Sequence, residues 1–540
     1  MESFENEATY RKFLTENRED EFDRLFNDAV KTTEANILGK EFPIYINGEP
    51  RTSKDKLVER SPINGTPIGT FQKGDRILAK EAIDAADNAF ESWSSLDYKK
   101  RASIFEKAAD ILSKEKFLVS AIMSIENGKT RYESVGEVDE GIDFLRYYSY
   151  LMLKNRGYVT KNSFKAADKQ TKNPGFQGAP GRTEKVKIEM KPYGAFGVIA
   201  PFNFPISISI GMSTGALITG NTVVFKPSSS SNMTMLTGLK IFEILRDAGL
   251  PAGAFNYITG PGSEIGQEFV NNPKIKGIAF TGSRAVGMSM IKASYEAGSQ
   301  KVFVVEMGGK NPVIVSKHAD LDIATKGIIS SAFGYCGQKC SAASRLLIDE
   351  TIKDALLAKL TAYAKKLRIG NPLLKEVYLG PLISADAVKK YDYALDEIKR
   401  MGKVLCGGHR VKNGLSDLYV EPTIAQIEKG NKLLKEELFV PILLISTYKR
   451  FDDAIKMAND VDYGLTAGVY SQEHSEIKRF FEKVESGVMY SNREIGATTG
   501  AIVGVHSFVG WKGSGLTGKG TGSKYYLEQF MHEKSESMTI

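Results

Sequence analysis

Four short apolar runs, each ending in Pro, Gly or Ser, constrain the fold of this chain more than any other feature. They lie at 197–202 (GVIAPF), 221–228 (NTVVFKPS), 255–262 (FNYITGPG) and 277–283 (GIAFTGS), and helical segments such as 233–248 separate them. Strands that alternate with helices predict a parallel sheet, and ligands bind at the carboxyl ends of such strands. The polar, glycine-rich ends of these runs are therefore expected at a ligand site.

Other segments extend this α/β pattern along the chain. Apolar residues recur at helical spacing over 76–112 and 137–153, and a second alternating region runs from 313 to about 490. Residues 18–34 followed by 42–50 predict a helix and then a hairpin. A stretch rich in Gly, Pro and Lys at 169–185 predicts an exposed loop that leads into a strand.

Length and charge narrow the class of protein. A chain of 540 residues exceeds what one hydrophobic core organises, so at least two domains with a cleft between them are expected. Its 72 basic and 65 acidic residues are interspersed, and a net charge of +7 gives no case for nucleic acid. The three cysteines fit no disulfide framework and indicate a reducing compartment.

The first residues of the sequence and its apolar runs bear on the expected location of the protein. Its first twenty residues lack an apolar core behind a basic start, and their acidic residues argue against a transit peptide. No stretch of about 18 uninterrupted apolar residues occurs. We therefore expect a cytoplasmic protein that does not span a membrane.

The strongest local signal is GYCGQKCSA at 334–342, where small residues leave the sulfur of Cys340 unshielded. A reactive thiol needs access and a lowered pKa. Taken alone, a cysteine is more often a buried small apolar residue, but the surrounding motif favours a nucleophile.

Two further motifs place polar side chains at strand ends. Glu306 leaves an apolar strand at the Gly-Gly turn of EMGGKNP, where a carboxylate could act as a base. Asn203 lies within PFNFP, where a rigid amide could stabilise an oxyanion. In isolation the glutamate would equally suit a salt bridge, and the asparagine would equally suit an Asx turn.

In this order, the three motifs resemble the aldehyde dehydrogenase superfamily, and NTVVFKPS, FTGSRAVG and EELFVP agree with it. The resemblance covers nearly the whole chain. It implies an α/β aldehyde dehydrogenase fold with a Rossmann-like cofactor domain, an α/β catalytic domain and a small β oligomerisation hairpin. The chain divides accordingly into an N-terminal helical extension at 1–45, an NAD(P)-binding domain at 46–155 and 193–307, a catalytic domain at 308–510, and oligomerisation strands at 156–192 and 511–540.

The resemblance implies a site for NAD or NADP. Lys226 would bind the adenosine ribose, and Ser283 would approach the pyrophosphate at a helix start. Glu437 would bind the nicotinamide ribose, with Phe439 beside the nicotinamide. The other expected cofactor contacts are Pro201, Phe202, Ser229, Gly262 and Gly282.

The resemblance also implies a mechanism. Cys340 as a thiolate attacks the aldehyde carbon, while its backbone N–H and the Asn203 amide receive the oxyanion. Hydride passes to the nicotinamide, and Glu306 deprotonates the water that hydrolyses the thioester. We expect no metal in this chemistry.

Within the superfamily, GKEFPIYINGE, EGIDFLRYY and GYCGQKCSAASR are most similar to 1-pyrroline-5-carboxylate dehydrogenases, which oxidise L-glutamate 5-semialdehyde to L-glutamate in proline breakdown. The resemblance implies that Ser341, Gly500, Ala501 and Phe508 bind the substrate. It also implies a homo-oligomer, at least a dimer.

Departures from the subgroup leave some features open. The loop at 494–499 is inserted, and Val440 and Val509 stand where glycine is usual. Ser229 stands where a glutamate would repel a 2′-phosphate, so both NAD and NADP are expected. The alternatives are a dehydrogenase of succinate semialdehyde, lactaldehyde or glyceraldehyde, and a catalytically silent structural relative. Acylation of coenzyme A is disfavoured because Glu306 supplies a hydrolytic base.

Overall fold

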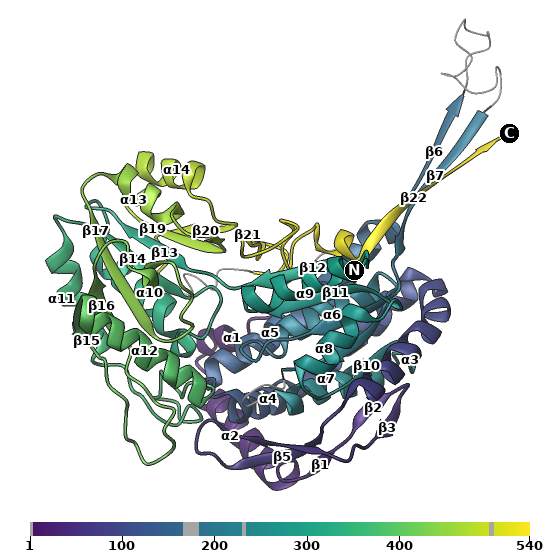
Figure 1. Ribbon diagram of the computed structural model, residues 1–540, viewed down its shortest axis with the longest axis horizontal. Helices are drawn as coiled ribbons and strands as arrows, with labels where there is room; N and C mark the ends of the chain where they lie inside the picture. Colours follow the sequence, from purple (N-terminus) through teal and green to yellow (C-terminus); the bar gives the residue numbers. More distant parts are fainter. Residues whose placement is uncertain (1–3, 166–182, 229–233, 496–501) are drawn as a thin grey trace, which may run out of the picture.

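The computed structural model describes residues 4–165, 183–228, 234–495 and 502–540. In these ranges the chain forms two lobes, each built on a seven-stranded sheet with helices on both faces, and a three-stranded ribbon that projects from the body (Figure 1). The predicted α/β class, with one sheet early in the chain and a second one later, is confirmed.

The first sheet contains the four apolar runs. Its strands β8 to β12 are parallel, in the order β12-β11-β8-β9-β10, and β2 continues the sheet antiparallel to β10, with β3 at the edge. Parallel strands separated by helices confirm the predicted βα organisation. The strands are β2 (Ile44–Ile46), β3 (Glu49–Arg51), β8 (Ala195–Ile199), β9 (Thr222–Lys226), β10 (Phe255–Tyr257), β11 (Ile275–Gly282) and β12 (Val302–Met307).

Along each strand of this sheet, alternate side chains point to opposite faces and pack into two separate cores. Val223 and Phe225 of β9 pack on one face, whereas Val224 between them packs on the other. A parallel strand covered on both faces needs apolar residues at every position, which explains why the runs are continuous. The Val223 face is covered by α4 (Tyr98–Asn127), α5 (Arg131–Lys154), α6 (Ser207–Ile218) and α7 (Met235–Asp247), and the Val224 face by α3 (Arg76–Ser95), α8 (Gly262–Asn271) and α9 (Arg284–Glu296).

The second sheet follows the same plan in the other lobe. Its order is β15-β16-β17-β14-β13-β19-β20, parallel except for β15. The strands are β13 (Asn311–Val315), β14 (Ala343–Asp349), β15 (Gly402–Cys406), β16 (Thr423–Ile427), β17 (Ile442–Tyr448), β19 (Thr466–Tyr470) and β20 (Val488–Ser491). The helices are α10 (Leu321–Phe333), α11 (Lys353–Ala364) and α12 (Ala385–Met401) on one face, and α13 (Phe451–Asn459) and α14 (His474–Lys483) on the other.

The projecting ribbon joins segments from distant parts of the sequence. Its order is β22-β7-β6, and all of its pairs are antiparallel. The alternating run VKIEMKPY belongs to β7 except for its last residue, Tyr193, as predicted for a strand. Most of the loop at 169–185 lies outside the described residues. The bounds are β6 (Val159–Lys165), β7 (Thr183–Pro192) and β22 (Met531–Thr539).

The N-terminal elements lie against the first lobe. The predicted helix at 18–34 is α2, which buries Phe22 and Phe26. The hairpin predicted at 42–50 is β2 and β3. The remaining short elements are α1 (Thr9–Thr15), α2 (Glu19–Asn36), β1 (Glu41–Phe42), β4 (Lys56–Arg60), β5 (Pro67–Gln72), β18 (Tyr463–Gly464), β21 (Trp511–Lys512), η1 (Arg156–Tyr158), η2 (Gly334–Gly337), η3 (Lys432–Leu434) and η4 (Tyr526–Phe530).

The helical region at 76–112 is two helices. Leu96 is extended, and the Asp97 carboxylate accepts the Lys99 backbone N–H, which starts α4. α4 then continues to Gly128, whose φ of 78° ends it in the left-handed region. None of the helices in the described ranges has the length and apolar character that crossing a bilayer requires.

Candidate active site

Two cavities meet between the lobes. The larger, about 890 Å³, follows the carboxyl ends of β8, β9, β11 and β12, and the smaller, about 470 Å³, lies beside α5. Cys340 and Glu306 line both cavities, as do Thr281 and Phe508. The two expected reactive groups therefore lie where a cofactor-sized cavity meets a cavity for a smaller molecule.

Glu306 is the next-to-last residue of strand β12, which ends just before the Gly-Gly pair. The strand is fixed here because the Met307 N–H donates to the Ser514 carbonyl at 2.8 Å. Oε2 of Glu306 is buried and accepts no hydrogen bond from the described residues. Burial raises the pKa of this carboxyl well above its usual value.

Cys340 follows a strained turn. Tyr335, Cys336 and Gly337 have φ of 49°, 53° and 65°, all in the left-handed region. A Cβ on Gly337 would lie 2.8 Å from the Val440 carbonyl oxygen, so this position excludes larger residues. Strain of this kind is found where a structure fixes a reactive group, and the Cys340 side chain here is half-buried at the junction of the cavities.

An amide that the sequence analysis did not single out fixes the backbone of the nucleophile. Asn311 Nδ2 donates to the carbonyl of Cys340 at 2.7 Å and to that of Ala342 at 2.9 Å. Its Oδ1 accepts the Thr466 N–H at 3.0 Å. Asn311 belongs to the motif EMGGKNP, which the sequence analysis quoted for Glu306. Its hydrogen-bond partners lie about 30 or more residues away in the sequence, so the motif alone does not predict them.

Burial raises the pKa of Cys340, and the carboxylates of Glu437 and Glu306 raise it further. The backbone N–H groups of Cys340 and Ser341 oppose this rise only in part. The expectation of a lowered thiol pKa therefore gains no support from these neighbours, because burial and two carboxylates all raise the pKa.

Asn203 is buried in the loop between β8 and α6. Its Nδ2 donates to the carbonyl of Gln338 at 3.0 Å, which ties this loop to the segment just before Cys340. Gln338 is held in turn, since its Oε1 accepts the Ile383 N–H at 2.8 Å. One amide hydrogen of Asn203 is engaged in this way, and the second is available at the wall of the larger cavity.

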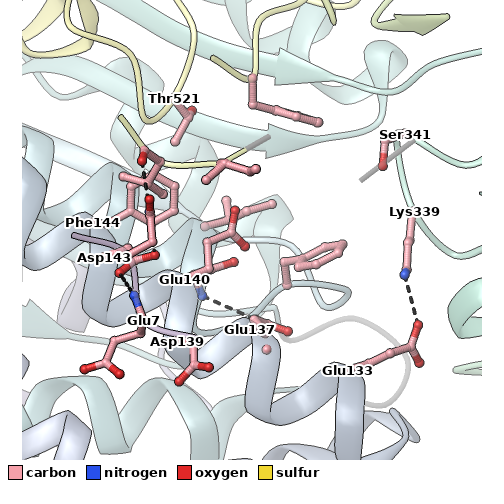
Figure 2. A pocket seen from close by; sticks show the side chains of 18 of the residues that line it. Glu7, Glu133, Glu137, Asp139, Glu140, Asp143, Phe144, Lys339, Ser341 and Thr521 are labelled. Carbon is pink, nitrogen blue, oxygen red and sulfur yellow. Dashed lines mark hydrogen bonds and ion pairs between the residues drawn. The ribbon is translucent and has the colours of Figure 1, made fainter. Parts of the chain in front are cut away.

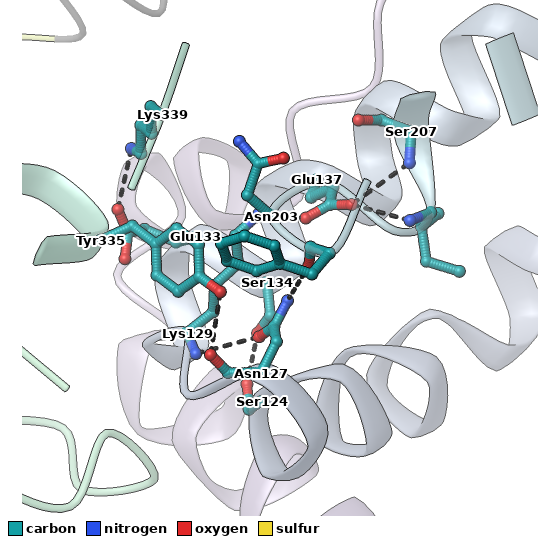
Figure 3. Close-up of polar contacts among 12 residues, drawn as sticks. Ser124, Asn127, Lys129, Glu133, Ser134, Glu137, Asn203, Ser207, Tyr335 and Lys339 are labelled. Carbon is teal, nitrogen blue, oxygen red and sulfur yellow. Dashed lines mark hydrogen bonds and ion pairs between the residues drawn. The ribbon is translucent and has the colours of Figure 1, made fainter. Parts of the chain in front are cut away.

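A buried network connects the Asn203 loop with the nucleophile turn (Figure 3). The Tyr335 hydroxyl donates to the Asn127 carbonyl at 2.9 Å. Lys129 forms a buried ion pair with Glu137, and its ammonium lies 3.7 Å from the centroid of the Phe204 ring. Oε1 of Glu137 accepts the backbone N–H of Ile206 at 2.8 Å. The ends of α4 and α5 thus hold both parts of the expected reaction centre.

The larger cavity collects nearly all the residues expected at the cofactor. Lys226 ends β9, and burial lowers its pKa to about 8. Ser283 is the N-cap of α9, where its Oγ accepts the Val286 N–H at 3.4 Å. Ser229 lies outside the described residues. The expected residues that line this cavity are Pro201, Phe202, Lys226, Gly262, Gly282, Ser283, Glu437 and Phe439, together with Lys390, which the sequence analysis missed.

Glu437 is held rigidly at this cavity. Its carboxylate accepts the Gly309 N–H at 2.8 Å. A side chain on Gly308, whose φ is 57°, would collide with the same carboxylate. Phe439 packs edge-to-face on Phe202 with ring centroids 5.9 Å apart. An oriented carboxylate and two aromatic rings suit the ribose and the ring of a dinucleotide, so the residues present fit the expected cofactor.

Carboxyl groups outnumber basic groups around the smaller cavity, and Figure 2 shows several of them. Its basic residues are Arg11, Lys129 and Lys339. Ser341 and Phe508 line it as expected for substrate contacts, whereas Gly500 and Ala501 lie outside the described residues. Lys339 pairs with Glu133 at 2.9 Å. The acidic residues that line the cavity are Glu7, Glu133, Glu137, Asp139, Glu140, Asp143 and Glu306. The sequence analysis did not anticipate this carboxylate-rich wall, which comes chiefly from α5.

In the described parts of the chain, no three His, Cys, Asp or Glu side chains are grouped so that they could hold a metal ion.

Comparison with known proteins agrees with this geometry. Residues 50–535 match the aldehyde dehydrogenase family. A 1-pyrroline-5-carboxylate dehydrogenase of Geobacillus sp. (strain WCH70) is 36% identical over 510 residues, which cover 93% of this chain and 94% of that protein.

Two solved structures are similar over almost the whole chain. The 1-pyrroline-5-carboxylate dehydrogenase from Thermus with bound NAD has a TM-score of 0.89 and 33% identity, covering 100% of this chain and 99% of that one. Proline utilization A from Bdellovibrio bacteriovorus has a TM-score of 0.89 and 32% identity, and the match covers 99% of this chain but 53% of that longer chain. The chain belongs to the aldehyde dehydrogenase family and is therefore an oxidoreductase, as its motifs predicted.

Proposed function

We propose that this protein oxidises L-glutamate 5-semialdehyde to L-glutamate with NAD⁺ or NADP⁺, as a step of proline breakdown. The observation that carries the proposal is that Cys340 and Glu306 lie at the junction of the two cavities. The names of the relatives, which match nearly the whole chain, support the substrate.

In the proposed first step, the thiol proton of Cys340 passes to solvent water and the sulfur bonds to the aldehyde carbon. The carbonyl π electrons move to oxygen, where the Asn203 amide and the Cys340 N–H donate to the developing charge. Phe202 and Phe439 would hold the nicotinamide beside Cys340, and NAD(P)⁺, when bound, would accept the hydride that the thiohemiacetal loses as it becomes a thioester.

In the second step, Glu306 takes a proton from a water molecule as the oxygen attacks the thioester carbon. The carbon–sulfur bond breaks and the acid product leaves, while the proton on Glu306 passes to the departing sulfur, which restores both the thiol and the carboxylate. A buried carboxyl with a raised pKa is a stronger base than an exposed one once it is ionised, which suits this role.

The charge of the smaller cavity favours an amino-acid aldehyde. Among the described residues Glu140 has no ion-pair partner, and burial raises its pKa to about 7. A carboxylate of this kind is stabilised by an ammonium group and repels a second carboxylate. Glutamate 5-semialdehyde carries an ammonium group beside its carboxylate, succinate semialdehyde carries a carboxylate alone, and lactaldehyde and glyceraldehyde carry neither group. The carboxyl-rich wall therefore favours the proposed substrate through its ammonium group.

A substrate panel with both cofactors tests the proposal. We expect kcat/KM for glutamate 5-semialdehyde to exceed that for succinate semialdehyde, lactaldehyde and glyceraldehyde by at least about tenfold, the scale of one specific pocket contact. The measurement is the initial rate of NADH or NADPH formation. A preference of similar size for any of the other three aldehydes would refute the assignment, and no turnover with any aldehyde would favour the silent relative.

The pH profile of the protein should rise through neutrality. Because the pKa of the Cys340 thiol is raised, the thiolate fraction is small at pH 7 and grows roughly tenfold per pH unit. We expect kcat/KM to increase steadily between about pH 6 and pH 9, measured from initial rates with the same aldehyde at every pH. A flat profile below about pH 7.5 would show that cofactor binding lowers the thiol pKa.

We also propose roles for the residues and segments that the described geometry leaves untested. Ser341, Gly500, Ala501 and Phe508 would bind the amino-acid end of the substrate. The ribbon β6-β7-β22 would join subunits of a homo-oligomer, since its projecting strands bury little against the chain's own body. A cytoplasmic location and the domain bounds expected from the sequence stay predictions.

A further inference from the structure

The first described residues of the chain reach the aldehyde side of the candidate site. Residues 4–11, here called the N-terminal strap, run along α5. Asn6, Glu7, Ala8, Tyr10 and Arg11 line the same 470 Å³ cavity as Cys340 and Glu306. More than three hundred residues separate the strap from the nucleophile in the sequence.

Asn6 joins two walls of this cavity. Its Nδ2 donates to Oδ2 of Asp143 on α5 at 2.9 Å and to the carbonyl of Val503 at 3.0 Å. Val503 and its neighbour Ile502 also line the cavity. One amide side chain therefore fixes the spacing between α5 and the segment that begins at Ile502.

Two buried carboxylates hold the strap in place. Oδ1 of Asp143 accepts the Glu7 backbone N–H at 2.8 Å. Asp139, one helical turn earlier, accepts the backbone N–H and the hydroxyl of Thr9, both at 2.7 Å. Removing the strap would leave these buried oxygens without those donors, which is unfavourable.

Ion pairs and an aromatic contact complete the attachment. The Glu7 carboxylate pairs with Arg146 at 2.7 Å and with Lys116 at 3.3 Å. The ring of Phe4 lies 5.0 Å from the ring of Tyr147. The strap is thus a fixed part of the wall, held by α4, α5 and the segment after residue 501.

We propose that the N-terminal strap is a specificity determinant that limits the size of the aldehyde entering the smaller cavity, with Asn6 setting the spacing of the walls. The inference rests on the proposed function, because it takes this cavity as the aldehyde site. Removing the Asn6 amide frees the two walls to separate, and adding bulk at Ala8, an exposed residue that lines the cavity, narrows it. Each change alters the room for the aldehyde tail, and neither touches Cys340 or the larger cavity.

Two variants with opposite expected effects test the strap. For each variant we compare kcat/KM for hexanal with kcat/KM for propanal. For Asn6→Ala we expect the hexanal-to-propanal ratio to rise by about tenfold, a factor of the size that added methylene contacts in an apolar pocket provide. For Ala8→Phe we expect the same ratio to fall by a similar factor. The KM for NAD⁺ should stay at the wild-type value in both, and Asn6→Gln, which keeps an amide donor, should restore much of the wild-type ratio.

A matched control and a structural readout complete the experiment. Arg18→Ala removes two exposed ion pairs, with Glu16 and Glu21, that lie outside the strap, and it should leave the ratio unchanged. Hydrogen exchange of the peptide that covers residues 4–11 should accelerate in Asn6→Ala. An unchanged hexanal-to-propanal ratio in both strap variants overturns the proposal, even where exchange accelerates. A wild-type protein that oxidises no aldehyde would instead refute the proposed function, so the two failures are distinguishable.

Discussion

Replacing Cys340 by Ala should lower kcat by a factor on the order of 10⁴ or more, because the acyl intermediate forms on this sulfur and no other group can replace it. Cys340 lies at the junction of both cavities, whereas the other two cysteines line neither. The initial rate of NADH formation with a saturating aldehyde measures the loss. Binding of NAD⁺, followed by fluorescence quenching, should change little, since the residues that would hold the dinucleotide come from other segments.

Cys336 provides the matched control. It lies four residues before the nucleophile, is buried, and donates through Sγ to the Gly380 carbonyl at 3.0 Å. A serine hydroxyl can donate to the same carbonyl. Because the hydrogen bond is kept, Cys336→Ser should leave kcat within about threefold of the wild-type value. Substantial turnover by Cys340→Ala would contradict its role as nucleophile.

The sequence predicts the scaffold well because strand and helix periodicity are local. The runs at 197–202 and 277–283 begin with continuous small or apolar residues, and the structure places residues 197–199 in β8 and 277–282 in β11, strands that are covered on both faces. The reactive residues could be proposed for a related reason. Glu306 and Asn203 stand at the ends of such strands, where a parallel sheet binds its ligands.

What the sequence does not reveal is how distant residues hold these groups. Asn311 contacts the carbonyl of Cys340, and Asn6 contacts Asp143 across 137 residues, and neither pairing leaves a periodic signal. The raised pKa of the Cys340 thiol is equally invisible in a motif, because it depends on burial and on two carboxylates from other segments. Positions fixed by long-range packing can be found only once the fold is known.

Replacing Glu306 by Gln should lower kcat by about 10²- to 10⁴-fold while preserving a burst of NADH of about one equivalent per subunit. Gln keeps the shape of the carboxyl and cannot accept the proton of the hydrolytic water, so the thioester forms and then persists. Rapid-mixing absorbance at 340 nm separates the burst from the steady state.

The stability of the same variant distinguishes a catalytic base from a structural carboxylate. The pKa of Glu306 is raised on folding, so the stability that it contributes is present below its unfolded pKa and is lost as the pH rises through the folded value. A neutral Gln removes that dependence, and the Tm of Glu306→Gln at pH 8 should equal or exceed that of the wild type. A variant with lower Tm and no burst would mean that Glu306 holds the site together, whereas a stable variant with a burst and slow turnover identifies it as the base that releases the acid.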